Sequence, residues 1–191
     1  MMNNDILKQN IYEHIEVFKS ISDLDKDIDV AGNIMSKTID QGGKLIFCGN
    51  GGSASDSQHI SAEFVGRFIE DRVALASISL TADTSALTCI SNDYGFEHVF
   101  SRQIEALAKP EDCLIGISTS GNSSNVINAM NTAKKIGLST VTLLGKDGGD
   151  MATIGDVNII VRSHTTARIQ ESHIFIGHTL CQLVEKKLML A

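Results

Sequence analysis

Features that mark several classes of protein are missing from this sequence of 191 residues. It contains a single proline, Pro110, and therefore no proline-rich linker between domains. No apolar stretch is long enough to cross a bilayer, and residues 1–5 lack the basic and apolar regions of a secretory signal. We therefore expect one cytoplasmic domain that does not enter the membrane.

Cysteine is also sparse, and its spacing excludes a common kind of zinc site. The sequence has no C-x-x-C pair, so a cysteine-based zinc knuckle is disfavoured. Cys48 and Cys113 lie in apolar runs, where a buried thiol packs as a small hydrophobe. A disulfide framework is not expected in a cytoplasmic chain of this size.

Positive charge is scarce as well, because 16 Lys and Arg residues face 23 Asp and Glu residues, for a formal net charge of -7. This excess of negative charge repels nucleic acid and anionic membranes, so neither is an expected partner. An anionic substrate would have to be held by local groups such as helix N-termini, backbone N–H groups and hydroxyls.

The pattern of apolar residues predicts an α/β fold. Helical spacing covers the first forty residues, and Gly42 and Gly43 end it. Short β-branched runs then alternate with helical patterns, which is typical of a parallel sheet covered on both faces. Strands are predicted at 44–48, 74–80, 113–117, 140–144 and 157–161, and helices at 54–67, 85–90, 99–108, 126–136 and 167–189. The simplest partition is a single domain over 1–191, with a helical arm at 1–42 and an α/β core at 43–191.

The last predicted helix, 167–189, has apolar residues over more than one narrow face. A helix that packs only on a sheet needs a single apolar stripe. The surplus indicates burial against another subunit as well.

A glycine-rich loop, Gly49-Asn50-Gly51-Gly52-Ser53-Ala54, follows the first predicted strand and opens a helix. Glycines let the backbone approach a ligand, and the start of the helix supplies free N–H groups for an anion. The loop also matches G-x-G-x-x-A, but a dinucleotide site wants an acidic residue at the end of the second strand. Asp83 comes late for that role, so the dinucleotide interpretation is the weaker one.

A second loop, Ser118-Thr119-Ser120-Gly121-Asn122-Ser123, follows the third predicted strand and also opens a helix. Four hydroxyls at a helix N-terminus suit a phosphate monoester. An ordinary N-cap would explain one or two of these hydroxyls but not four. Between the second and third strands, Asn92-Asp93-Tyr94-Gly95-Phe96 is locally typical of a turn.

His59 and Glu63 are spaced i, i+4 on the helix after the glycine loop, so they lie on one face. Such a pair can share a metal ion, although a surface ion pair is the alternative. Their position just after the ligand loop favours the metal. His178 lies in an apolar context where a core histidine is the simpler interpretation, yet it could complete a set of two nitrogens and one oxygen. His14, His98 and His164 are expected to be surface residues.

Together these segments resemble the sugar isomerase (SIS) domain superfamily, and within it the phosphoheptose isomerase family. The resemblance runs over nearly the whole chain. It is carried by CGNGGSASDSQHISAEFVGR, SNDYGFEHVFSRQIEAL, LIGISTSGNSSNVI, LLGKDGG and ARIQESHIFIGHTLCQLVE. It implies a flavodoxin-like αβα sandwich with a five-stranded parallel sheet and a long C-terminal helix, assembled as a homotetramer with active sites at subunit boundaries.

The resemblance also implies zinc and a set of site residues. The family's zinc ligands match His59, Glu63, Gln170 and His178, and its acid–base pair matches Glu63 and His178. Its substrate contacts match Asn50, Gly51, Gly52, Ser53, Glu63, Asn92, Asp93, Ser118, Thr119, Ser120, Ser123 and Gln170. Asp56 and Arg67 match positions near the site. The acidic residue that some members carry is replaced here by Ala167.

The expected reaction converts sedoheptulose 7-phosphate to the aldose D-glycero-D-manno-heptose 7-phosphate through an enediol, the first step toward a nucleotide-activated heptose for lipopolysaccharide or capsule. A carboxylate and an imidazole are suitable acid–base groups, each contributing typically ~10²–10⁴-fold. Glu63 and His178 are also expected to bind the metal, which weakens a base. Either their ligation exchanges with substrate or the metal is chiefly organisational.

Two alternatives remain at this point: a non-catalytic regulator of the same fold, or an isomerase of another sugar phosphate. The family's regulators lack the acid–base pair that Glu63 and His178 form here, which favours an enzyme. A spacing problem also remains. Gln170 and His178 are eight residues apart, about 12 Å of helical rise, so we expect that a neighbouring subunit supplies part of the site.

Overall fold

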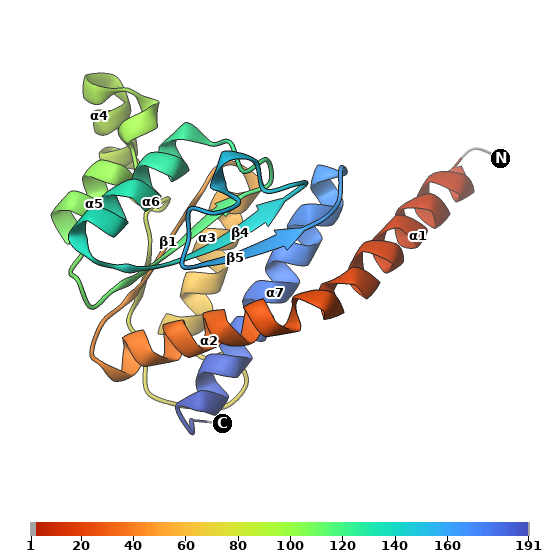
Figure 1. Ribbon diagram of the computed structural model, residues 1–191, viewed down its shortest axis with the longest axis horizontal. Helices are drawn as coiled ribbons and strands as arrows, with labels where there is room; N and C mark the ends of the chain where they lie inside the picture. Colours follow the sequence, from red (N-terminus) through yellow and green to blue (C-terminus); the bar gives the residue numbers. More distant parts are fainter. Residues whose placement is uncertain (1–2, 191) are drawn as a thin grey trace.

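The computed structural model describes residues 3–190, and its centre is a five-stranded parallel sheet (Figure 1). The strands are β1 (Leu45–Gly49), β2 (Ser77–Ser79), β3 (Cys113–Ser118), β4 (Ser139–Gly145) and β5 (Val157–Val161). Their order is β2-β1-β3-β4-β5, and every neighbouring pair is parallel. The predicted flavodoxin-like sheet is confirmed. Every residue of β1 and β3 is buried, because helices cover both faces.

Seven α-helices accompany the sheet in the described part of the chain. They are α1 (Asn3–Ile21), α2 (Asp25–Asp40), α3 (Gly52–Val65), α4 (Thr84–Tyr94), α5 (Ser101–Leu107), α6 (Ser124–Ile136) and α7 (Thr166–Lys187). Short 3-10 turns occur at Ser22–Leu24, Phe96–His98 and Gly149–Met151. Helices α2, α3 and α7 cover one face of the sheet, and α5 and α6 cover the other. Among residues 3–190, no helix is both long and apolar enough to span a membrane.

The predicted arm at 1–42 is divided by the structure into two unlike helices. Helix α2 belongs to the core layer, where it packs on α7 and buries Ala31 and Met35 completely. Helix α1 projects away from the sheet (Figure 1). The apolar side chains along most of its length are exposed: Ile6, Leu7, Ile11, Tyr12 and Ile15. Only its last turns reach the core, where Ile21 is buried.

Two sequence predictions are wrong in their bounds. The second strand, predicted over 74–80, is limited to Ser77–Ser79, because irregular chain leads into it. The turn predicted at 92–96 is helical as far as Tyr94, since α4 extends four residues beyond its predicted end. Gly95, with φ of 92°, then ends the helix in a conformation that favours glycine.

Candidate active site

The glycine loop and the serine loop, residues 118–123, lie next to each other at the carboxyl ends of β1 and β3. The strand order reverses between these two strands, and open α/β sheets bind ligands at such a point. The side-chain amides of Asn50 and Asn125 join the loops through two reciprocal hydrogen bonds of 2.8 and 2.9 Å. Asn50, predicted to contact substrate, therefore also fixes the spacing of the two loops. Asn125 lies within the segment LIGISTSGNSSNVI but was not among the predicted site residues.

The glycine loop is shaped by close approaches of neighbouring groups. Gly51 has φ of 56° and precedes the first residue of α3. A Cβ at Gly52 would lie 2.8 Å from Cδ of Gln170 and closer still to its amide nitrogen. The absence of a side chain at Gly52 is therefore what lets Gln170 of α7 lie directly over the loop.

Three of the four predicted hydroxyls of the serine loop converge. The hydroxyl of Ser118 lies 2.9 Å from that of Ser123 and 3.5 Å from that of Ser120, and it accepts a hydrogen bond from the Gly121 N–H. Ser123 precedes α6 without capping it through its side chain. These hydroxyls thus lie at a helix N-terminus, as an anion site requires. Thr119 contributes no hydrogen bond to this cluster.

Helices α3 and α7 run side by side and bring the predicted metal ligands together. Gly177 lies against Ile60, where an added Cβ would come within 2.7 Å of Cγ1 of Ile60, so the missing side chain permits the close approach. His178 then faces His59, with 3.4 Å between the two Nε2 atoms. Nε2 of His59 lies 3.3 Å from Oε1 of Glu63. One donor atom from each of the three side chains lies within 4.8 Å of the others.

This geometry fits a tetrahedral ion. Zinc binds imidazole nitrogen and carboxylate oxygen at ~2.0–2.1 Å, and the edge of such a tetrahedron is about 3.4 Å. The two shorter donor separations match that edge. Catalytic zinc sites typically have three protein ligands and keep a fourth position open, and two nitrogens and one oxygen are available here. His59, Glu63 and His178 can therefore hold the metal that the resemblance implies.

Gln170, the fourth predicted ligand, lies elsewhere in this chain. Its side chain covers Gly52, and it shares α7 with His178, about 12 Å away along the axis. As a metal ligand Gln170 stays a prediction. Its observed position places it beside the glycine loop.

Other predicted residues surround the site less closely. Asn92 and Asp93 are exposed on the last turn of α4, where Asn92 donates to Asp93 at 2.8 Å. Arg67 is exposed and donates to the Ile69 carbonyl. Burial raises the pKa of the Asp56 carboxyl to about 6, with His59 opposing the shift. Its Oδ2 atom is buried and has no partner among the described residues.

The weaker dinucleotide interpretation loses support in the structure. The Asp83 carboxylate caps α4 by accepting from the N–H groups of Ser85 and Ala86. It is therefore engaged at a helix N-terminus. The predicted burial of Cys48 and Cys113, by contrast, is confirmed.

Two histidines outside the proposed metal site are at least partly buried. His14, predicted to be a surface residue, is half-buried and pairs with Glu171 at 2.8 Å between Nδ1 and Oε2. Its ring stacks on Phe18, because α1 crosses α7 at this point. His173 is fully buried and contacts the carbonyl of Leu144 at 3.0 Å. Burial lowers the pKa of His173 to about 4.

Comparison with known proteins places this site in a family. The family model described as SIS domain matches residues 11–145. Phosphoheptose isomerase of Aliarcobacter butzleri is 48% identical over 187 residues, which is 98% of this chain and 99% of that protein. This chain belongs to the phosphoheptose isomerases of the SIS domain family.

Two solved phosphoheptose isomerase structures extend the match to three dimensions. The enzyme of Neisseria gonorrhoeae has a TM-score of 0.91 at 41% identity, over 96% of this chain and 98% of that one. That of Francisella tularensis has a TM-score of 0.93 at 31% identity, over 97% and 100%. The SIS domain match ends before α7, whereas the match to phosphoheptose isomerases includes this helix. The family relationship therefore covers both sides of the proposed metal site.

Proposed function

We propose that this chain is an aldose–ketose isomerase that converts sedoheptulose 7-phosphate to D-glycero-D-manno-heptose 7-phosphate. One observation carries the proposal: His59 and Glu63 of α3 meet His178 of α7 within 4.8 Å, in a chain whose relatives over its full length are phosphoheptose isomerases. A regulator of the same fold would not need this combination of carboxylate and imidazoles.

The reaction moves hydrogen between the first two carbons of the open-chain sugar. In the proposed mechanism Glu63 takes the proton from C1 of the ketose, and a proton is returned to C2. His178, on the opposite face, helps to move the proton between the two oxygens. Positioned acid–base groups of this kind contribute ~10²–10⁴-fold each.

Zinc is the proposed metal, held by His59, Glu63 and His178, with Gln170 as a further candidate ligand. When bound it would act as a Lewis acid toward the sugar oxygens. The side chains of the chain itself hold the sugar and carry the protons.

The hydroxyls of Ser118, Ser120 and Ser123 are proposed to bind the phosphate, together with the free N–H groups at the start of α6. His59 follows Gly52 by seven residues, or about 10 Å of helical rise. A seven-carbon substrate has its phosphate at one end and its reacting carbons at the other, so two separate binding regions suit it.

Asn50, Gly51, Gly52, Ser53, Asn92, Asp93, Thr119 and Gln170 are the remaining proposed substrate contacts. Asn92 and Asp93 point to solvent from α4. Their proposed role therefore requires a site shared between subunits.

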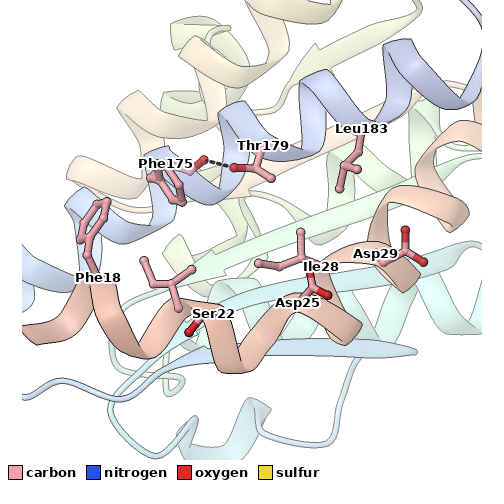
Figure 2. A pocket seen from close by; sticks show the side chains of 9 residues that line it. Phe18, Ser22, Asp25, Ile28, Asp29, Phe175, Thr179 and Leu183 are labelled. Carbon is pink, nitrogen blue, oxygen red and sulfur yellow. Dashed lines mark hydrogen bonds between the residues drawn. The ribbon is translucent and has the colours of Figure 1, made fainter.

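A homotetramer is the proposed assembly. An apolar hollow of about 450 Å³ lies between α1–α2 and α7. The residues that line it include Phe18, Ile28, Phe175 and Leu183 (Figure 2). Phe175 is 46% exposed there, beside a projecting α1 whose apolar side chains are also exposed. A second copy that covers these surfaces would bury them and bring its own residues to the site. Charged substitutions on α1 should produce a monomer that loses both metal and activity.

The proposed location is cytoplasmic, and the proposed product is the precursor of a nucleotide-activated heptose for lipopolysaccharide or capsule. The direct test is incubation of purified protein with sedoheptulose 7-phosphate, following aldose formation with and without a chelator. Aldose formation that chelation abolishes and zinc restores is expected. Absence of product at every metal loading would favour a non-catalytic role instead.

A further inference from the structure

One of the proposed metal ligands is held by a neighbour that no motif marks. We propose that Phe68 is a positioning residue for the His178 imidazole, and that the buried Arg72–Glu185 ion pair holds Phe68 in place. This inference rests on the proposed metal site.

Two other rings lie close to the ring of His178. Phe68 stacks on it, with 5.4 Å between centroids and 30° between planes, and His59 meets it edge-on at 5.0 Å and 73°. Within residues 3–190, no protein group hydrogen-bonds to Nδ1 of His178.

Metal-binding histidines are usually oriented by a hydrogen bond at their second ring nitrogen. The χ2 torsion of histidine has broad minima, so an imidazole without such a bond can rotate. Packing against Phe68 is the contact that limits this rotation and keeps Nε2 directed at His59 and Glu63.

Phe68 belongs to the irregular segment between α3 and β2, and its backbone ties it to α7. The Phe68 N–H donates to Oε1 of Glu185 at 3.3 Å, and the same oxygen accepts from Nε of Arg72 at 2.6 Å. The side chains of Arg72 and Glu185 are 2% and 0% exposed. An ion pair that is this buried holds its partners in one arrangement, because breaking it leaves an unpaired buried charge.

The remaining N–H groups of Arg72 bind backbone carbonyls around the end of α3. Nη2 donates to the Glu63 carbonyl at 2.9 Å, and Nη1 donates to the Phe64 carbonyl at 2.8 Å and the Val73 carbonyl at 3.0 Å. Glu185 follows His178 by seven residues, or two turns of α7. Arg72 therefore joins three segments: the turn of α3 with Glu63, the segment with Phe68, and the helix with His178.

The test measures binding of Co²⁺, whose visible absorption reports its coordination geometry, to the full chain and to single variants. Phe68→Leu and Phe68→Met remove the ring, and Phe68→Tyr keeps it. Ile69→Ala is the matched control, since Ile69 is the next residue and is 46% exposed. A circular-dichroism melt checks that each variant is folded. Two variants that remove the ring are used, so that the result does not depend on a single substitution.

Loss of an outer-shell partner typically costs 10–100-fold in metal affinity or activity. We expect the Co²⁺ dissociation constant to rise by about that factor in Phe68→Leu and Phe68→Met, with an altered spectrum. Phe68→Tyr and Ile69→Ala should bind Co²⁺ like the wild type. In the isomerase assay, kcat should fall in the ring-deleting variants while KM changes little.

Wild-type affinity and spectrum in Phe68→Leu, or equal losses in Phe68→Tyr and Phe68→Leu, would overturn the role of the ring. Glu185→Gln should lower Co²⁺ affinity in the same way, and an unchanged affinity there would overturn the role of the ion pair. If the wild type itself binds neither Co²⁺ nor Zn²⁺, the proposed metal site fails, and this inference with it. Failure of the metal site and failure of the positioning role of Phe68 therefore give different results.

Discussion

Replacing Gly52 with Ala tests whether Gln170 acts from its position over the glycine loop. The new Cβ would lie 2.8 Å from Cδ of Gln170, whereas non-bonded heavy atoms prefer about 3.5–4.0 Å. The amide must therefore retreat by at least about 1 Å, a displacement that can cost ~10²-fold in rate when it affects a positioned group. Gly52 is the first residue of α3 and its φ is not positive, so alanine itself fits the backbone.

We expect kcat/KM for sedoheptulose 7-phosphate to fall by about 10–100-fold in Gly52→Ala. The melting temperature should stay within a few degrees of the wild-type value, since only the end of a flexible side chain has to move. The control is a double-mutant cycle: in a Gln170→Ala background, Gly52→Ala should cause no further loss. Wild-type kinetics in Gly52→Ala, or additive losses in the double variant, would refute a coupling between Gly52 and Gln170.

Two further predictions concern the buried side chain of His173 and the serine loop. His173 has a folded-state pKa of about 4, below its ordinary value of 6.5, so stability is full above pH 6.5 and declines as pH falls toward 4. The free energy of unfolding should fall by about 3 kcal/mol over this range. Urea unfolding should show a smaller fall in His173→Asn, and an identical pH dependence in the two proteins would contradict this role of His173. Ser118→Ala should raise KM by about 10-fold or more with kcat nearly unchanged, because a hydrogen bond to a charged group contributes about 1.5–3 kcal/mol. Ser124→Ala, at an exposed serine that directly follows the serine loop, is the control. Equal KM values in the two variants would exclude Ser118 from phosphate binding.

The sheet was predictable because its signals are local. Buried strands such as Cys113–Ser118 are nearly continuous apolar runs, and glycine or hydroxyl-rich loops follow them directly. The pair His59 and Glu63 could be placed on one helical face for the same reason. Local patterns failed at Asn92 and Asp93, where turn-forming residues end a helix instead of forming a loop.

The remainder of the site depends on contacts between distant segments. His178 meets His59 only because Gly177 lets α7 approach Ile60 of α3, a fact with no local signature. Phe68 lies in an irregular segment without periodicity, and its partner Glu185 is 117 residues away. Glu185 was the one available signal, because it is a charged residue within the apolar pattern of the last helix. A carboxylate in such a position is buried only if it is paired.

The most direct measurement is the turnover of Glu63→Gln, which keeps the size of the side chain and removes the carboxylate. We predict that isomerisation of sedoheptulose 7-phosphate falls by at least ~10²-fold, while calorimetry still detects binding of the sugar phosphate through the serine loop. Near-normal turnover in this variant, with the protein folded, would contradict the proposal that a carboxylate and imidazoles from α3 and α7 carry out the reaction.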